Sequence, residues 1–167
     1  MPSGYQTVKG PARPVSLMRV SVIGGGEITD AESKLAERVG RELGTRGHDV
    51  VCGGLGGTMW AVCRGASEAG GRTIGILPTN SVADANPHVD VPIATGMGHA
   101  RNALVPLNGD AVIALAGSTG TLSEIGFAHV YERPIVGLGA AEVPSLDMET
   151  ASTPQAAVEF VESAVSE

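Results

Sequence analysis

Three clusters of glycine constrain this chain more than any other feature, because each follows a short apolar run and precedes a helical pattern. They lie at 24–26, 53–57 and 117–120. Glycine after an apolar run marks backbone that turns tightly or comes close to a ligand. Apolar runs that alternate with helical patterns predict a parallel sheet with crossover helices. The carboxyl ends of parallel strands share one edge, so the three clusters should converge there.

The pattern predicts an α/β fold, a three-layer sandwich around a mostly parallel sheet of six or seven strands. Residues 1–17 carry three prolines and two glycines without an apolar period, and we expect a mobile tail there. Residues 18–167 should form a single domain. We expect strands at 18–23, 49–52, 72–77, 91–94, 111–116 and 134–138, and helices at 29–44, 58–69, 99–107, 121–131 and from 153 onward.

The composition of the chain argues against several classes of function. Hydrophobic residues make up 43% of the 167 residues and aromatic residues only 3%, so the core must be aliphatic. A net charge of −7 without a basic stripe argues against binding long nucleic acid. The chain has no signal-peptide pattern at 1–17 and no apolar run of ~18 residues that would span a membrane. We therefore expect a cytoplasmic protein, with Cys52 and Cys63 as reduced thiols.

Glycine loops that open helices leave backbone N–H groups free to bind an anion. Three such loops at one edge predict a site for a small phosphorylated, nucleotide-like ligand. The G-x-G-x-x-G dinucleotide pattern fails because Thr29 stands at the third position, and no P-loop motif is present. The four histidines lack metal-ligand spacing. The candidate ligand residues are Gly24, Gly25, Gly26, Gly53, Gly54, Gly56, Gly57, Thr58, Gly117, Ser118, Thr119, Gly120 and Thr121.

Two segments resemble the Lonely-Guy superfamily of Rossmann-like proteins, many once labelled lysine decarboxylases. They read GGLGGTMWAVCRGASEAGGRTIGILP and ARNALVPLNGDAVIALAGSTGTLSEIGFAHV, and the resemblance covers about residues 18–138. The hallmark P-G-G-x-G-T-x-x-E is matched by 116–124, with Ala116 in place of proline and Ser118 in place of the second glycine. A second hallmark is an arginine usually followed by lysine; here Arg101 is followed by Asn102.

The resemblance implies two possible functions. In a phosphoribohydrolase branch, Arg101 and Glu124 would be the catalytic pair, and a carboxylate suits the oxocarbenium character of N-glycosidic cleavage. Another branch carries molybdenum cofactor, a pterin monophosphate, without converting it. The Arg-Asn pair and the looser motif are more similar to that branch. We therefore expect carriage of a nucleotide or pterin cofactor, with nucleoside 5′-monophosphate hydrolysis as the alternative. No other cofactor is required, and a homodimer or larger homo-oligomer is implied.

Structural interpretations compete with these functions. Thr121-x-x-Glu124 is also a capping box, so Glu124 can simply cap its helix. Arg101 can lie on an exposed helix face, and a vestigial site on an interaction protein is a third possibility. Lysine decarboxylase activity is excluded, because pyridoxal phosphate needs a lysine. The only lysines are Lys9 in the tail and Lys34 on the solvated face of a helix.

Overall fold

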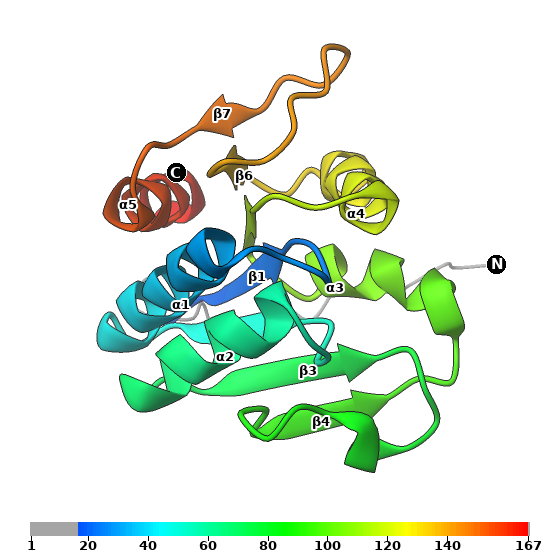
Figure 1. The fold of residues 1–167 in the computed structure, drawn as a ribbon. Helices are drawn as coiled ribbons and strands as arrows, with labels where there is room; N and C mark the ends of the chain where they lie inside the picture. Colours follow the sequence, from blue (N-terminus) through cyan, green and yellow to red (C-terminus); the bar gives the residue numbers. More distant parts are fainter. Residues whose placement is uncertain (1–16, 167) are drawn as a thin grey trace, which may run out of the picture.

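A single parallel sheet organises residues 17–166, the part of the chain that the computed structural model describes (Figure 1). The predicted tail, 1–17, lies outside the described residues apart from Leu17. Every strand pair is parallel, which confirms the predicted α/β fold. The spatial order is β4-β3-β2-β1-β5-β6-β7. The strands are β1 (Arg19–Ile23), β2 (Asp49–Cys52), β3 (Thr73–Leu77), β4 (Val91–Ala94), β5 (Ala111–Ala114), β6 (Ile135–Gly137) and β7 (Glu149–Thr150).

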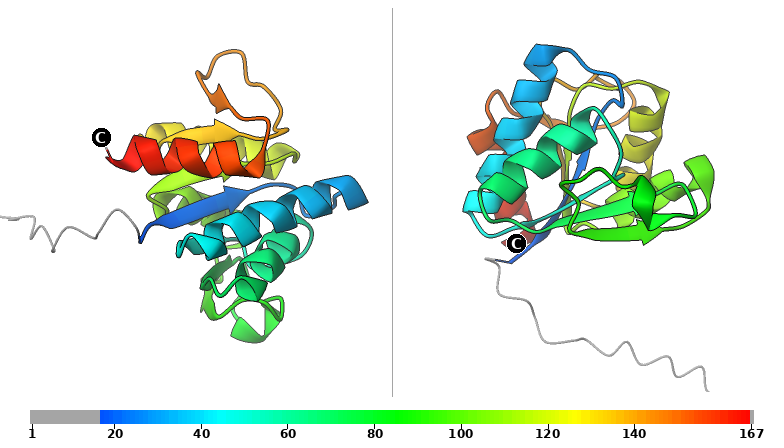
Figure 2. Two further views of the ribbon diagram at one scale, coloured as in Figure 1. Left: turned by 90° about the vertical axis from the view of Figure 1, so that its left-hand side faces the viewer. Right: turned by 60° about the horizontal axis from the view of Figure 1, so that its bottom comes forward.

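Helices cover both faces of the sheet and make the three layers of a Rossmann-like sandwich. On one face lie α1 (Asp30–Thr45), α2 (Thr58–Glu68) and α5 (Pro154–Ser166); on the other lie α3 (Leu104–Leu107) and α4 (Thr119–Val130) (Figures 1 and 2). Successive side chains of a strand point to opposite faces of the sheet, so one strand contributes to both hydrophobic cores. Val20 and Val22 of β1 pack in the first core, and Ile23 packs in the second.

The two cores are built from aliphatic side chains, as the composition predicts. Val39 of α1 and Val62 of α2 are fully buried against the sheet on one side, and Ile125 of α4 is buried on the other. Cys52 and Cys63 are both buried free thiols in the first core, with their sulfurs 3.4 Å apart. No described helix combines the length and the apolar character that crossing a membrane requires.

A local signal in the sequence accounts for the start of α1. Thr29 caps α1 in a capping box: its Oγ1 accepts from the Glu32 N–H at 3.2 Å, and Glu32 Oε2 accepts from the Thr29 N–H at 3.0 Å. The helix predicted at 99–107 is α-helical only at 104–107. A 3-10 helix, η2 (Gly98–Ala103), precedes the single α-helical turn of α3, which contains Pro106. The segment between β3 and β4, for which no helix was predicted, contains a 3-10 turn, η1 (Val82–Asp84).

Candidate functional site

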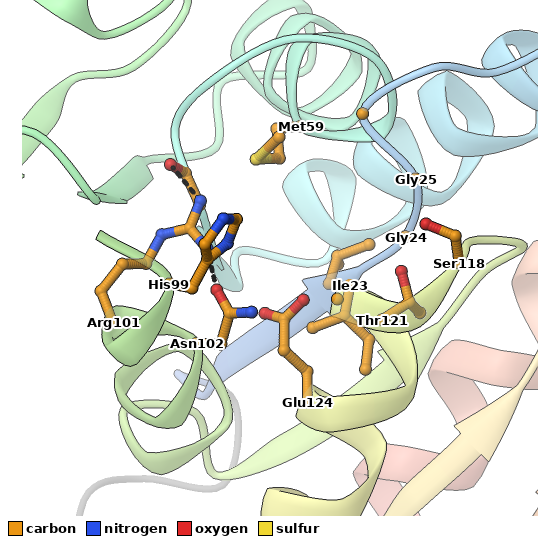
Figure 3. Close-up of a pocket in the computed structure, with 14 residues that line it drawn as sticks. Ile23, Gly24, Gly25, Met59, His99, Arg101, Asn102, Ser118, Thr121 and Glu124 are labelled. Atoms are coloured by element: carbon orange, nitrogen blue, oxygen red, sulfur yellow. Dashed lines mark hydrogen bonds between the residues drawn. The ribbon is translucent and has the colours of Figure 1, made fainter. Parts of the chain in front are cut away.

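A cavity of about 180 Å³ opens at the carboxyl ends of β1 and β5 (Figure 3). These strands are neighbours in the sheet, with Ile23 beside Ala114, although the two residues are far apart in the sequence. The chain leaves the two strands in opposite directions along the sheet. Ligands of open α/β sheets bind at such a switch point. The lining residues are Val22, Ile23, Gly24, Gly25, Gly26, Gly53, Met59, His99, Arg101, Asn102, Ser118, Gly120, Thr121 and Glu124.

The three glycine loops meet here through backbone contacts. The Thr58 N–H donates to the Gly25 carbonyl at 3.0 Å, and the Gly25 N–H donates to the Ala116 carbonyl at 2.8 Å. Gly57 adopts φ +61°, and a Cβ on it would collide with the carbonyl oxygens of Gly25 and Gly26. The second loop therefore supports the first, which in turn is bonded to the third.

The predicted ligand residues divide into two groups. Gly24, Gly25, Gly26, Gly53, Ser118, Gly120 and Thr121 line the cavity. The others do not: Gly54 packs against Gly75 of β3, Gly56 and Thr119 are exposed, Gly57 and Thr58 support the first loop, and Gly117 lines an adjoining cavity. For the residues that line the cavity, ligand binding remains a prediction. The residues that do not line it support the loops, are exposed, or line the adjoining cavity.

Helix α4 begins at this cavity without a side-chain cap. Its N-cap, Ser118, makes no capping hydrogen bond. The backbone N–H groups of Thr119, Gly120 and Thr121 have no hydrogen-bond partner among residues 17–166. Helix N-termini normally satisfy such groups with a cap, water or a ligand, and they attract negative charge. The first turn of α4 is thus equipped to bind an anion.

Arg101 is buried beside this turn, with 9% of its surface exposed, so the exposed-face interpretation is wrong. Its Nε donates to the Ile76 carbonyl at 2.9 Å and its Nη2 to the Gly53 carbonyl at 3.5 Å. Its Nη1 donates to Asn102 Oδ1. Burial lowers the pKa of the guanidinium, while Glu124 and Cys52 oppose that shift. Arginine stays charged in proteins, so the site holds a fixed cation.

Glu124 is also buried, at 8% exposed, and its side chain points into the space between α4 and η2 (Figure 3). The capping interpretation is wrong, because α4 starts at Thr119 and places Glu124 in its second turn. The carboxylate makes no hydrogen bond within the described chain. Burial raises the pKa of Glu124 to about 7, and Arg101 acts in the opposite direction. Near neutral pH this group can therefore hold or release a proton.

Five residues that line the cavity were not among the predicted site residues: Val22 and Ile23 at the end of β1, and Met59, His99 and Asn102. Asn102 had a usable signal, since it directly follows Arg101. Met59 and His99 had none beyond their position next to a glycine loop. Among residues 17–166 no group of three or more His, Cys, Asp or Glu side chains is arranged to hold a metal ion.

Comparison with known proteins places this chain among relatives of two kinds. An uncharacterized protein of Archaeoglobus fulgidus is 38% identical over 146 residues, which are 87% of this chain and 95% of that protein. The cytokinin riboside 5′-monophosphate phosphoribohydrolase of Mycobacterium tuberculosis is 33% identical over 112 residues. That match spans 62% of this chain and 60% of that enzyme.

Two solved structures are similar over nearly the whole chain. The molybdenum cofactor binding protein of Rippkaea orientalis has a TM-score of 0.82 and 32% identity, covering 88% of this chain and 96% of that one. The molybdenum cofactor carrier protein of Chlamydomonas reinhardtii has a TM-score of 0.80 and 30% identity, covering 89% and 98%.

These findings confirm the resemblance drawn from the glycine motifs. The model of the SLOG cluster4 family matches residues 17–165, which is nearly all of the described chain. The chain belongs to the SLOG cluster4 family.

Proposed function

We propose that this protein binds and carries a small phosphorylated ligand of the pterin type, such as molybdenum cofactor, at the cavity between β1 and β5. One observation carries the proposal. The uncapped first turn of α4 has three unpartnered N–H groups, and two of them, those of Gly120 and Thr121, belong to residues that line the cavity with the buried cation Arg101. Backbone donors and a helix dipole suit a phosphate group, and the charge of Arg101 adds to that attraction.

Carriage, rather than conversion, is supported by how Arg101 is held. All three of its nitrogens donate to acceptors of the protein itself: two backbone carbonyls and the amide of Asn102. An arginine bound in this way supplies a fixed charge, and it is less free to follow a leaving group. The similarity to molybdenum cofactor binding and carrier proteins spans almost the whole chain, whereas the match to a phosphoribohydrolase spans 62% of it.

The proposal is tested by mixing the purified protein with molybdenum cofactor and separating bound from free ligand on a desalting column. We expect the cofactor to elute with the protein and to be recovered chemically unchanged. Adenosine 5′-monophosphate, incubated with the protein in parallel, should yield no free adenine. Failure to retain the cofactor, under conditions where the folded protein is intact, would contradict carriage.

A second function, hydrolysis of a nucleoside 5′-monophosphate, is favoured by Glu124. Its buried, unpartnered carboxyl faces the cavity, and its pKa of about 7 suits a group that handles protons or stabilises positive charge on a sugar. This function predicts free base and ribose 5-phosphate in the same incubation. Glu124→Gln should then abolish release of base while leaving ligand retention largely intact.

A further inference from the structure

A chain of hydrogen bonds joins Arg101 to the first turn of α4. Arg101 Nη1 donates to Asn102 Oδ1. Asn102 Nδ2 lies 3.2 Å from Ser123 Oγ, and Ser123 Oγ lies 2.6 Å from the Gly120 carbonyl oxygen. Two elements of the site, η2 and α4, are therefore connected by side chains.

The direction of this chain is fixed by the chemistry of its ends. Arginine has donors and no acceptor, so the oxygen of the Asn102 amide must face it. The NH₂ group of Asn102 then faces Ser123 and can only donate. At the other end the Gly120 carbonyl can only accept, so the Ser123 hydroxyl must donate to it. Every hydrogen bond thus runs from the guanidinium toward the carbonyl of Gly120.

The last link acts on a peptide group of the anion site. The Gly120 carbonyl belongs to the same peptide unit as the Thr121 N–H, one of the unpartnered donors at the cavity. A hydrogen bond to the oxygen of a peptide group polarises it and makes its N–H a stronger donor, and chains of aligned hydrogen bonds reinforce one another. Ser123 is exposed, so water weakens but does not reverse this effect.

We propose that Asn102 and Ser123 are positioning residues that transmit the charge of Arg101 to the first turn of α4 and strengthen the Thr121 N–H as an anion donor. The proposal rests on the proposed function only for the identity of the anion. Neither side chain needs to touch the phosphate. Asn102 lines the cavity, but its amide is engaged on both sides by Arg101 and Ser123.

The test uses Ser123→Ala, which removes the last link, and Ser123→Thr, which keeps the hydroxyl. Ser166→Ala is the matched control, because Ser166 Oγ also donates to a helix carbonyl, that of Glu162, but in α5. Titration with inorganic phosphate should show affinity lowered roughly twofold in Ser123→Ala, because this variant weakens one donor of the site and removes no hydrogen bond to the anion. Ser123→Thr should restore the affinity, and Ser166→Ala should leave it unchanged.

A second readout separates this proposal from the proposed function. In the ligand-free protein, the ¹⁵N resonance of Thr121 reports hydrogen bonding at the preceding carbonyl. We expect it to shift in Ser123→Ala and also in Asn102→Asp, where an oxygen replaces the Nδ2 donor and draws the Ser123 hydroxyl away from Gly120. An unchanged Thr121 resonance in both variants would overturn the relay. If the resonance shifts but the wild-type protein binds no phosphate compound, the relay stands and the proposed function fails.

Discussion

Glu124 combines three properties that rarely occur together in a carboxyl group. It is buried, it has no hydrogen-bond partner among residues 17–166, and it shares a cavity with a buried cation. Desolvation outweighs the attraction of Arg101, so the pKa of Glu124 lies well above that of an exposed glutamate. A group of this kind costs stability whenever it is ionised, and a protein retains such a cost where a ligand benefits.

The raised pKa of Glu124 predicts a specific pH dependence of stability. The native carboxyl titrates at about 7 and the unfolded one near 4.5, so the native state holds a proton between these values that the unfolded state has lost. Stability should therefore fall as pH rises through this window and level off above it. Glu124→Gln should be more stable than the wild type at pH 8, by at most about 3 kcal/mol.

Urea denaturation at pH 5 and pH 8 checks this prediction. The advantage of Glu124→Gln should shrink toward pH 5, because the wild-type carboxyl is then protonated in the native state. Glu27→Gln, in the exposed loop after β1, serves as the control for removing a charge. Equal stability of Glu124→Gln and the wild type at both pH values would show that ionisation of Glu124 does not destabilise the native state.

At the scale of elements, the contrast between α1 and α4 separates structure from function. Both helices begin at the carboxyl edge of the sheet. Helix α1 has a complete capping box at Thr29, whereas α4 has no side-chain cap at Ser118. The first turn of α4 therefore keeps free N–H donors beside the cavity. We attribute the missing cap to the anion that α4 is proposed to bind.

A side-chain cap added to α4 should therefore stabilise the protein and weaken its binding of an anion. In Ser118→Asp, the carboxylate can accept from the first-turn N–H groups and stabilise α4 by about 1 kcal/mol. The same carboxylate should repel an anion and weaken binding of adenosine 5′-monophosphate roughly tenfold or more. Calorimetric titration measures the affinity, and Ser67→Asp adds the same charge at the far end of α2 as a control. Undiminished binding by Ser118→Asp would place the anion elsewhere.

Helices α1 and α2 approach so closely that glycine is required at their contact. A Cβ on Gly40 would collide with the Val62 carbonyl of α2. Alanine raises helix propensity by about 1 kcal/mol over glycine, but overpacking here should reverse that gain. We expect Gly40→Ala to lose about 1–3 kcal/mol of stability in thermal unfolding.

The matched control is Gly126→Ala in α4, where a Cβ would meet no atom within 4 Å. The free energy of unfolding of Gly126→Ala should rise by up to about 1 kcal/mol, because alanine has the higher helix propensity and its Cβ meets no clash there. A gain in both variants would mean that the two helices can separate at no cost.

The sequence predicts most of the elements and part of the site, and the failures have physical causes. Thr29 signals a helix start because its cap is local, whereas η2 depends on tertiary contacts of the buried Arg101. Strand β7 has two residues, too few to show a period. The position of each glycine cluster after a strand predicts that the three loops converge at one edge of the sheet. Only the packing shows that Gly57 and Thr58 support the loop at Gly25. The burial of Glu124 likewise requires η2 beside α4.

At the scale of the whole molecule, the order of the strands decides where the site lies. The chain builds β1 to β4 outward in one direction and then returns to place β5 on the other side of β1. This reversal opens the crevice between the loops after β1 and β5. The charged residues of the cavity are Arg101, which η2 contributes, and Glu124, which α4 contributes. Homo-oligomer formation and a cytoplasmic location stay predictions.

We propose that this crevice binds a phosphorylated ligand through the first turn of α4. The most direct test is thermal unfolding of the purified protein with increasing molybdenum cofactor or adenosine 5′-monophosphate, beside Gly120→Val, which fills the cavity mouth, and Gly126→Val, which does not line it. We predict that the unfolding temperature of the wild type and of Gly126→Val rises with ligand concentration, and that Gly120→Val shows no rise. No rise for the wild type with either compound, or an equal rise in Gly120→Val, would contradict the account.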